Sequence, residues 1–174
     1  DKLNQLKDKI SLITGATSGI GLATAEMLAS EGSHLILIAR RKDRLETIAQ
    51  NLIETHKVKV ITIVADLQHL MEVNSCIQQL SVDWQNIDIL INNAGLARGM
   101  GKLHENLISD WEEMIDTNVK SMLYVTKNIV PLMLKNGKGD IINIGSVAGR
   151  AAYPNGTVYC ATKAAVKSIS DGFR

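Results

Sequence analysis

The 174 residues are enough for one domain with a sizeable buried core, and 45% apolar with 21% charged residues is ordinary for a globular protein. The net charge is +1, acids and bases are interleaved, and aromatic residues make up 3%, so neither nucleic acid nor membrane is indicated as a partner. The polar stretch 1–9 lacks the apolar core of a signal peptide, and no apolar run reaches membrane-spanning length, which predicts a cytoplasmic protein. Cys76 and Cys160 lack metal-site spacing, so reduced thiols and no metal are expected.

Strand and helix patterns alternate along the chain. Apolar strands are predicted at 9–14, 34–39, 58–64, 87–91 and 140–144, and amphipathic helices at about 19–31, 45–53, 73–80, 109–135 and from 158 onward. This alternation predicts an α/β fold, a doubly wound parallel sheet with helices on both faces. In the longest helix one side is expected to be buried, with Asn118 beside it; that side carries Trp111, Ile115, Val119, Met122, Thr126, Ile129 and Met133.

A glycine-rich turn, Gly15-x-x-x-Gly19-x-Gly21, follows the first strand and opens the first helix. Such a turn lets the backbone approach a diphosphate, and the helix N-terminus offers it free N–H groups. The turn lacks the Gly-Lys-Ser/Thr ending of a P-loop, which argues against nucleoside triphosphate hydrolysis. The alternative is a tight turn that binds no ligand.

Tyr159 and Lys163 are four residues apart in the last predicted helix and would share one face of it. A neighbouring cation stabilises a phenolate, so this tyrosine could act as an acid or base near neutral pH. Ser146, at the end of an apolar strand, could hold a substrate oxygen against the phenol. The alternative is a solvated pair on a helix surface.

Together these residues resemble the short-chain dehydrogenase/reductase family over almost the whole chain, from about Lys9 to Arg174. The motifs match in order and spacing: Thr14-Gly15-x-x-x-Gly19-x-Gly21, Asn92-Asn93-Ala94-Gly95, Asn118, Ser146 and Tyr159-x-x-x-Lys163. The resemblance implies a Rossmann-type sheet, binding of NAD(H) or NADP(H), and reversible hydride transfer between an alcohol and a carbonyl.

The resemblance also implies residue roles. Tyr159 would be the general acid/base, Ser146 would position the substrate oxygen, Lys163 would assist the tyrosine and hold the nicotinamide ribose, and Asn118 would keep a water in the proton relay. Asn92 would lie along the cofactor and Asp66 would touch the adenine. The cofactor-binding set predicted in all, including two arginines assigned below from charge, is Gly15, Thr17, Ser18, Gly19, Ile20, Gly21, Arg40, Arg41, Asp66, Leu67, Asn92, Ala94, Gly95, Tyr159 and Lys163.

The choice of cofactor can be argued from charge at the end of the second strand. A carboxylate there would bond a ribose 2′-hydroxyl and repel a 2′-phosphate, whereas a guanidinium grips the phosphate. The strand runs into Arg40-Arg41, with no acid until Asp43. We therefore predict NADP(H), with Arg40 as the main phosphate ligand and Arg41 assisting; two solvated arginines are the alternative.

The chain stops at Arg174 inside a predicted helix, without a cap or glycine stop. This indicates either a truncated molecule or the ordered part of a longer chain. Residues 1–174 are therefore expected to form a single dinucleotide-binding Rossmann domain that lacks the family's C-terminal strands. Two functions are then open: an active NADP-dependent oxidoreductase acting on a secondary alcohol or its carbonyl, or a non-catalytic or truncated dinucleotide-binding protein. Retention of Asn118, Ser146, Tyr159 and Lys163 favours catalysis.

The sequence constrains the identity of the substrate less than that of the cofactor. The Arg-Arg strand end and the stretch from Gly149 to Pro154 loosely resemble the branch acting on 3-hydroxy acids and related small alcohols; 3-ketoacyl thioester reduction is the alternative. Arg150 could meet an acidic substrate and Tyr153 a ring or chain, although ordinary loop surface is favoured for both. The family resemblance implies a homodimer or homotetramer packed through the helices carrying Asn118 and Tyr159.

Overall fold

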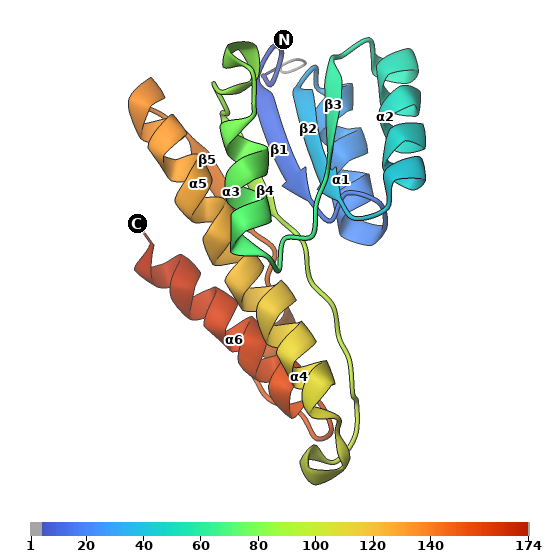
Figure 1. The fold of residues 1–174 in the computed structure, drawn as a ribbon, viewed down its shortest axis with the longest axis vertical. Coiled ribbons are helices and arrows are strands. Elements are labelled where there is room, and N and C mark those ends of the chain that lie inside the picture. Colours follow the sequence, from blue (N-terminus) through green and yellow to red (C-terminus); the bar gives the residue numbers. More distant parts are fainter. Residues whose placement is uncertain (1–4, 174) are drawn as a thin grey trace.

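The computed structural model describes residues 5–173 and contains one five-stranded sheet (Figure 1). Its strand order is β3-β2-β1-β4-β5, and every neighbouring pair is parallel. The chain winds outward from β1 through β2 to β3, then returns to the other side of β1 for β4 and β5. The predicted doubly wound parallel sheet is confirmed. The strands are β1 (Ile10–Thr14), β2 (His34–Ala39), β3 (Val60–Val64), β4 (Ile89–Asn92) and β5 (Asp140–Asn143).

Helices cover both faces of this sheet. They are α1 (Gly19–Ser30), α2 (Lys42–His56), α3 (Leu70–Gln78), α4 (Ile108–Ile115), α5 (Ser121–Asn136) and α6 (Thr157–Gly172). Short 3-10 turns at Val82–Trp84, Leu103–Glu105 and Val147–Gly149 complete the connections. None of the helices within residues 5–173 is long and apolar enough to cross a bilayer.

The core consists of two layers of side chains, one on each face of the sheet. Leu35 and Leu37 of β2 pack with residues of α1 and α2, while Ile36 and Ile38 face the layer formed with α3 and α5. These four side chains are at most 1% exposed. Because β2 is covered on both sides, its sequence is apolar throughout rather than alternating.

The longest predicted helix contains an interruption. A π turn at Asp116–Lys120 joins α4 to α5, and the Ser121 hydroxyl donates to the Asp116 carbonyl at 2.9 Å. The wider turn rotates the buried side relative to a regular helix. The expectation that Ile115 faces the core is therefore wrong: it is 40% exposed, whereas Met114 is 1% exposed.

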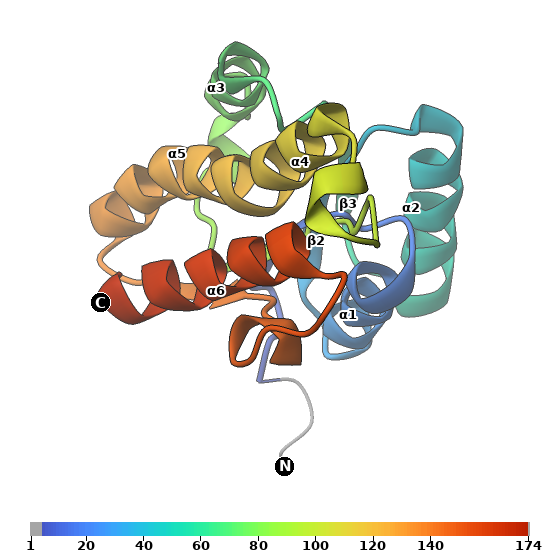
Figure 2. The same ribbon diagram turned by 90° about the horizontal axis from the view of Figure 1, so that it is seen from below.

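The last helix, α6, lies beside α4 and the π turn rather than over the centre of the sheet (Figures 1 and 2). Its second turn comes close to the 3-10 turn that follows β5, where Gly149 packs against the backbone of Lys163. A Cβ at Gly149 would lie 2.6 Å from the Lys163 carbonyl oxygen. This contact brings the first half of α6 to the carboxyl end of β5.

Candidate functional site

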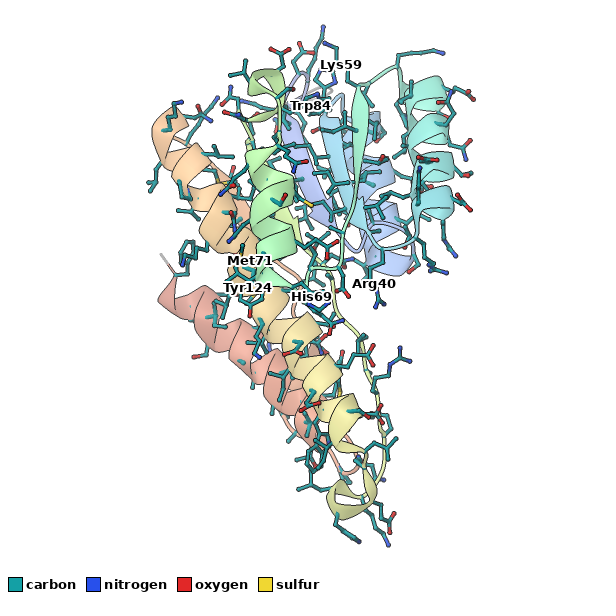
Figure 3. The ribbon with its side chains drawn as sticks, viewed as in Figure 1. Arg40, Lys59, His69, Met71, Trp84 and Tyr124 are labelled. Atoms are coloured by element: carbon teal, nitrogen blue, oxygen red, sulfur yellow. The ribbon has the colours of Figure 1, made fainter. Side chains whose placement is uncertain are left out.

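A groove of about 740 Å³ runs along the carboxyl ends of the strands. It lies where β1 meets β4 and the chain changes direction, which is where doubly wound sheets bind ligands. Arg40 and His69 lie at this end of the strands, whereas Lys59 and Trp84 lie at the other (Figure 3). The predicted cofactor residues that line the groove are Gly15, Thr17, Ser18, Gly19, Ile20, Arg40, Arg41, Asp66, Leu67, Ala94 and Gly95.

The glycine turn shapes the first wall of the groove. Gly15 has φ +62° and Gly19 φ +54°, conformations that side chains rarely adopt, and a Cβ on Gly19 would meet nothing within 4 Å. Gly21 instead packs so closely against Gly15 that a Cβ at position 21 would overlap the Gly15 carbonyl oxygen. Ser18 is the N-cap of α1 without a side-chain capping bond, so the first N–H groups of this helix face the groove free to bind an anion.

The turn after β4 is fastened to the glycine turn. The Thr14 hydroxyl accepts from the backbone N–H groups of Asn93 and Ala94, both at 3.0 Å. The Asn93 amide donates to the Gly15 carbonyl, also at 3.0 Å. Two segments nearly 80 residues apart are thereby held as one wall.

Asn92 does not line the groove. Its Nδ2 donates to the Thr126 hydroxyl at 3.0 Å and to Asn143 Oδ1 at 2.9 Å, and its side chain is buried. The residue therefore ties β4 to α5 and β5, and its contact with a cofactor stays a prediction.

Asn118 lies in the π turn and is 2% exposed. Its Oδ1 accepts from the Leu96 N–H at 2.7 Å, and its Nδ2 donates to the Leu96 carbonyl at 2.8 Å and to the Thr162 hydroxyl at 3.0 Å. The amide thus clamps the segment after β4 to α6. Both Nδ2 hydrogens are used, which leaves the second lone pair of Oδ1 for the relay water that we predict.

Lys163 and Tyr159 lie one turn apart on α6. Lys163 is 8% exposed, and its Nζ donates to the Ile144 carbonyl at 3.4 Å. A Cβ on Gly95 would lie 3.3 Å from the same Nζ, so the ammonium reaches the rim of the groove. Burial lowers the pKa of Lys163 below its usual value, because a buried ammonium is poorly solvated.

Ser146 caps the 3-10 turn that follows β5. Its Oγ accepts from the Ala148 N–H at 3.1 Å, which holds the side chain while its own hydrogen stays available to a substrate oxygen. The structure thus brings Ser146 and the α6 residues to the same end of the sheet, beside the groove rather than in its lining.

The groove suits a phosphorylated dinucleotide. Its volume falls within the range of about 300–1,000 Å³ of ligand sites. Arg40 and Arg41 line it at the end of β2, where a 2′-phosphate would lie. The Thr117 hydroxyl is buried in its wall without a hydrogen-bond partner among residues 5–173, so a ligand group could satisfy it.

Sequence reasoning missed several residues of this site. Asn93 belongs to the Asn92-Asn93-Ala94-Gly95 motif, but no role was predicted for it. Thr117 and Arg98 also line the groove, and neither belongs to a sequence motif. Arg44 supports the glycine turn, because its Nε donates to the Thr17 carbonyl at 2.7 Å. The repeated arginines at 40, 41 and 44 were the available signal for that contact.

Comparison with known proteins gives matches along nearly all of the chain. The family model for short chain dehydrogenases matches residues 9–174. An uncharacterised oxidoreductase of Staphylococcus saprophyticus is 43% identical over 99% of this chain and 68% of its own. The NADP-dependent 3-hydroxy acid dehydrogenase of Schizosaccharomyces pombe is 41% identical over 99% of this chain and 67% of its own. The chain thus spans about two thirds of the length of these relatives.

Solved structures with the same arrangement include serine dehydrogenase from Escherichia coli, with 39% identity and a TM-score of 0.87 over 95% of this chain and 74% of that one. The closed form of serine dehydrogenase complexed with NADP+ gives the same identity and TM-score over 65% of its chain. An NAD+-bound xylitol dehydrogenase has a TM-score of 0.92 at 28% identity, over 97% of this chain and 64% of its own.

Proposed function

Because this chain belongs to the short-chain dehydrogenase family, we propose that it is an NADP(H)-dependent oxidoreductase that interconverts the hydroxyl of a small 3-hydroxy acid, or a related alcohol, and its carbonyl. The observation that carries the proposal is Lys163, a residue 8% exposed that lies one turn from Tyr159 on α6 and whose ammonium reaches the rim of the groove. Among the described residues it donates to one carbonyl only, at 3.4 Å. A buried cation so weakly paired calls for further partners, which a phenolate and a ribose would provide.

The choice of NADP(H) is supported from two directions. Arg40 and Arg41 line the groove at the end of β2, where a 2′-phosphate would need cations. The relatives named as NADP-dependent and the serine dehydrogenase complexed with NADP+ bear out this choice.

NADP+ supplies the acceptor of the hydride that leaves the substrate carbon. The chain's own residues bind the substrate oxygen and transfer its proton. Ser146 donates its free hydroxyl hydrogen to that oxygen, which fixes the reacting carbon. Tyr159 takes the hydroxyl proton during oxidation and returns it during reduction.

Lys163 stabilises the charged form of the phenol through its ammonium, and its lowered pKa eases passage of the proton onward to water. Asn118 holds the segment after β4 against α6, so that the groove wall and the tyrosine keep their spacing. The net change in oxidation is one hydride from carbon and one proton from oxygen.

The substrate class follows the relatives. One is named for 3-hydroxy acids and another for serine, which is itself a 3-hydroxy acid. Reduction of a 3-ketoacyl thioester is the alternative. A panel of hydroxy acids, esters and ketoacyl thioesters, followed by NADPH absorbance at 340 nm, separates the two.

The test of catalysis is Tyr159→Phe, which removes one phenolic oxygen. We expect loss of at least about 100-fold in kcat, the scale of general acid–base catalysis, with NADPH affinity retained. Tyr124→Phe is the matched control, because Tyr124 lies on α5 toward α3 (Figure 3). Equal rates for Tyr159→Phe and its parent would refute the assignment and favour a non-catalytic dinucleotide-binding protein.

We also propose a homodimer or homotetramer that packs through α4, α5 and α6. Ile115 and Leu123 support this, because they are 40% and 43% exposed on the α4–α5 surface. Light scattering after gel filtration measures the mass, and a monomer at micromolar concentration would contradict the proposal.

A further inference from the structure

We propose that Arg98 determines substrate specificity by binding the carboxylate of the 3-hydroxy acid while the reacting hydroxyl lies at Tyr159. This inference rests on the proposed function and names the residue that recognises the acid group. It depends on where Arg98 lies, which edge of its guanidinium is engaged, and which other cations are within reach.

Arg98 lies in the segment between β4 and α4 and borders two hollows. It lines the large groove and also a second hollow of about 10 Å³ whose wall includes Tyr159 and Trp111. Among residues 5–173 it is the only one that lines both. Arg98 is therefore part of the wall of the groove and also part of the wall next to the tyrosine.

The guanidinium is held in place by Glu113 of α4. Nε lies 3.2 Å from Oε2 and Nη2 lies 3.4 Å from Oε1, so one edge of the planar fork is engaged by this carboxylate. An arginine has five N–H donors on two edges, which leaves the Nη1/Nη2 edge available for a second carboxylate. The Arg98 side chain is 51% exposed, so this edge is open to an incoming ligand.

Four other cations of the described chain are less suited to this role. Arg40 and Arg41 follow β2, on the opposite side of β1 from β4, so their strand ends are about 10 Å from that of β4 at a strand spacing of roughly 4.8 Å. Arg150 is exposed and lines neither hollow, although the sequence suggested it as a partner for an acid. Lys102 is exposed and lies 3.8 Å from Glu105.

This assignment separates the two substrate classes. A 3-hydroxy acid carries its charged carboxylate two carbons from the reacting carbon, within reach of a cation near the tyrosine. A 3-ketoacyl thioester has a neutral carbonyl at that position, so the open edge of Arg98 would gain no charged partner from it. Arg98 thus favours the free acid.

The test compares Arg98→Met with the parent on (S)- and (R)-3-hydroxybutyrate, serine and the methyl ester of each hydroxybutyrate. Charge-assisted hydrogen bonds of about 1.5–3 kcal/mol correspond to a rise in KM for the acids on the order of 10- to 100-fold. We expect kcat to be largely retained, KM for the esters to be unchanged, and Arg98→Lys to recover part of the loss. NADPH affinity, measured by fluorescence, should not change.

Arg150→Met is the matched control and should behave as the parent on both acids and esters. Equal losses on acid and ester in Arg98→Met would overturn the proposal, as would a parent protein that turns over ester and acid equally well. The latter comparison needs no variant, so it holds even if Arg98→Met fails to fold. Either result leaves the proposed oxidoreductase activity standing, because Tyr159→Phe tests that activity separately.

Discussion

Replacing Asn118 with alanine tests how the site is held together. The substitution removes an amide that is 2% exposed and makes three hydrogen bonds, two to the backbone of Leu96 and one to the Thr162 hydroxyl. These bonds join the segment after β4 to α6. Without them the N–H and carbonyl of Leu96, which are partly buried in the groove wall, lose their protein partners.

The expected loss in the free energy of unfolding follows from these three hydrogen bonds. An intramolecular hydrogen bond contributes about 1 kcal/mol net, so three contribute about 3 kcal/mol. Alanine has the higher helix propensity, which offsets roughly 0.5 kcal/mol. The free energy of unfolding should therefore fall by about 2–3 kcal/mol. In a chain of this length that lowers Tm by roughly 4–12 °C.

Urea unfolding at 25 °C and pH 7, followed by circular dichroism, measures the difference in the free energy of unfolding. Asn51→Ala, an exposed position within α2, is the control and should change stability by no more than about 0.5 kcal/mol. We also expect kcat to fall with stability, because the clamp fixes Tyr159 relative to the groove. A change below about 0.5 kcal/mol for Asn118→Ala would show that the three bonds contribute little and would refute this account of the residue.

Three further predictions concern the groove and α6. Gly149→Ala should lower the free energy of unfolding by about 1–3 kcal/mol, because its Cβ would lie 2.6 Å from the Lys163 carbonyl oxygen. In the control Gly145→Ala the new Cβ meets nothing within 4 Å, so urea unfolding should show no change, and equal effects of the two variants would contradict the packing argument. Burial lowers the pKa of Lys163, so the unfolded chain binds more protons between the lowered pKa and the ordinary value of about 10.4, and stability should rise with pH in that alkaline window. Lys163→Met should remove this slope in cofactor-free protein unfolded by urea at several pH values, and an identical slope would exclude the residue as its source. Arg40→Asp should raise KM for NADPH by about 10- to 100-fold without a matching rise for NADH, and an unchanged ratio of the two KM values would defeat its assignment to the 2′-phosphate.

The sequence alone predicted the strands well because burial on both faces leaves an unbroken apolar run, as in β2. It also predicted where ligands would gather, since the carboxyl ends of parallel strands share one edge. The glycine turn and the arginines after β2 were visible for the same reason: backbone freedom and charge are properties of residue types, and these residues directly follow strands.

Features that depend on contacts between distant segments could be found only in the tertiary structure. The π turn at Asp116–Lys120 leaves no periodic signal, so the buried side of that helix was wrong at Ile115. The amide of Asn92 binds Thr126 and Asn143, and Arg98 reaches two hollows only because α4 and the segment after β4 lie together. Periodicity reports which side of an element is apolar, whereas the partner of a polar side chain is set by the packing of elements far apart in the chain.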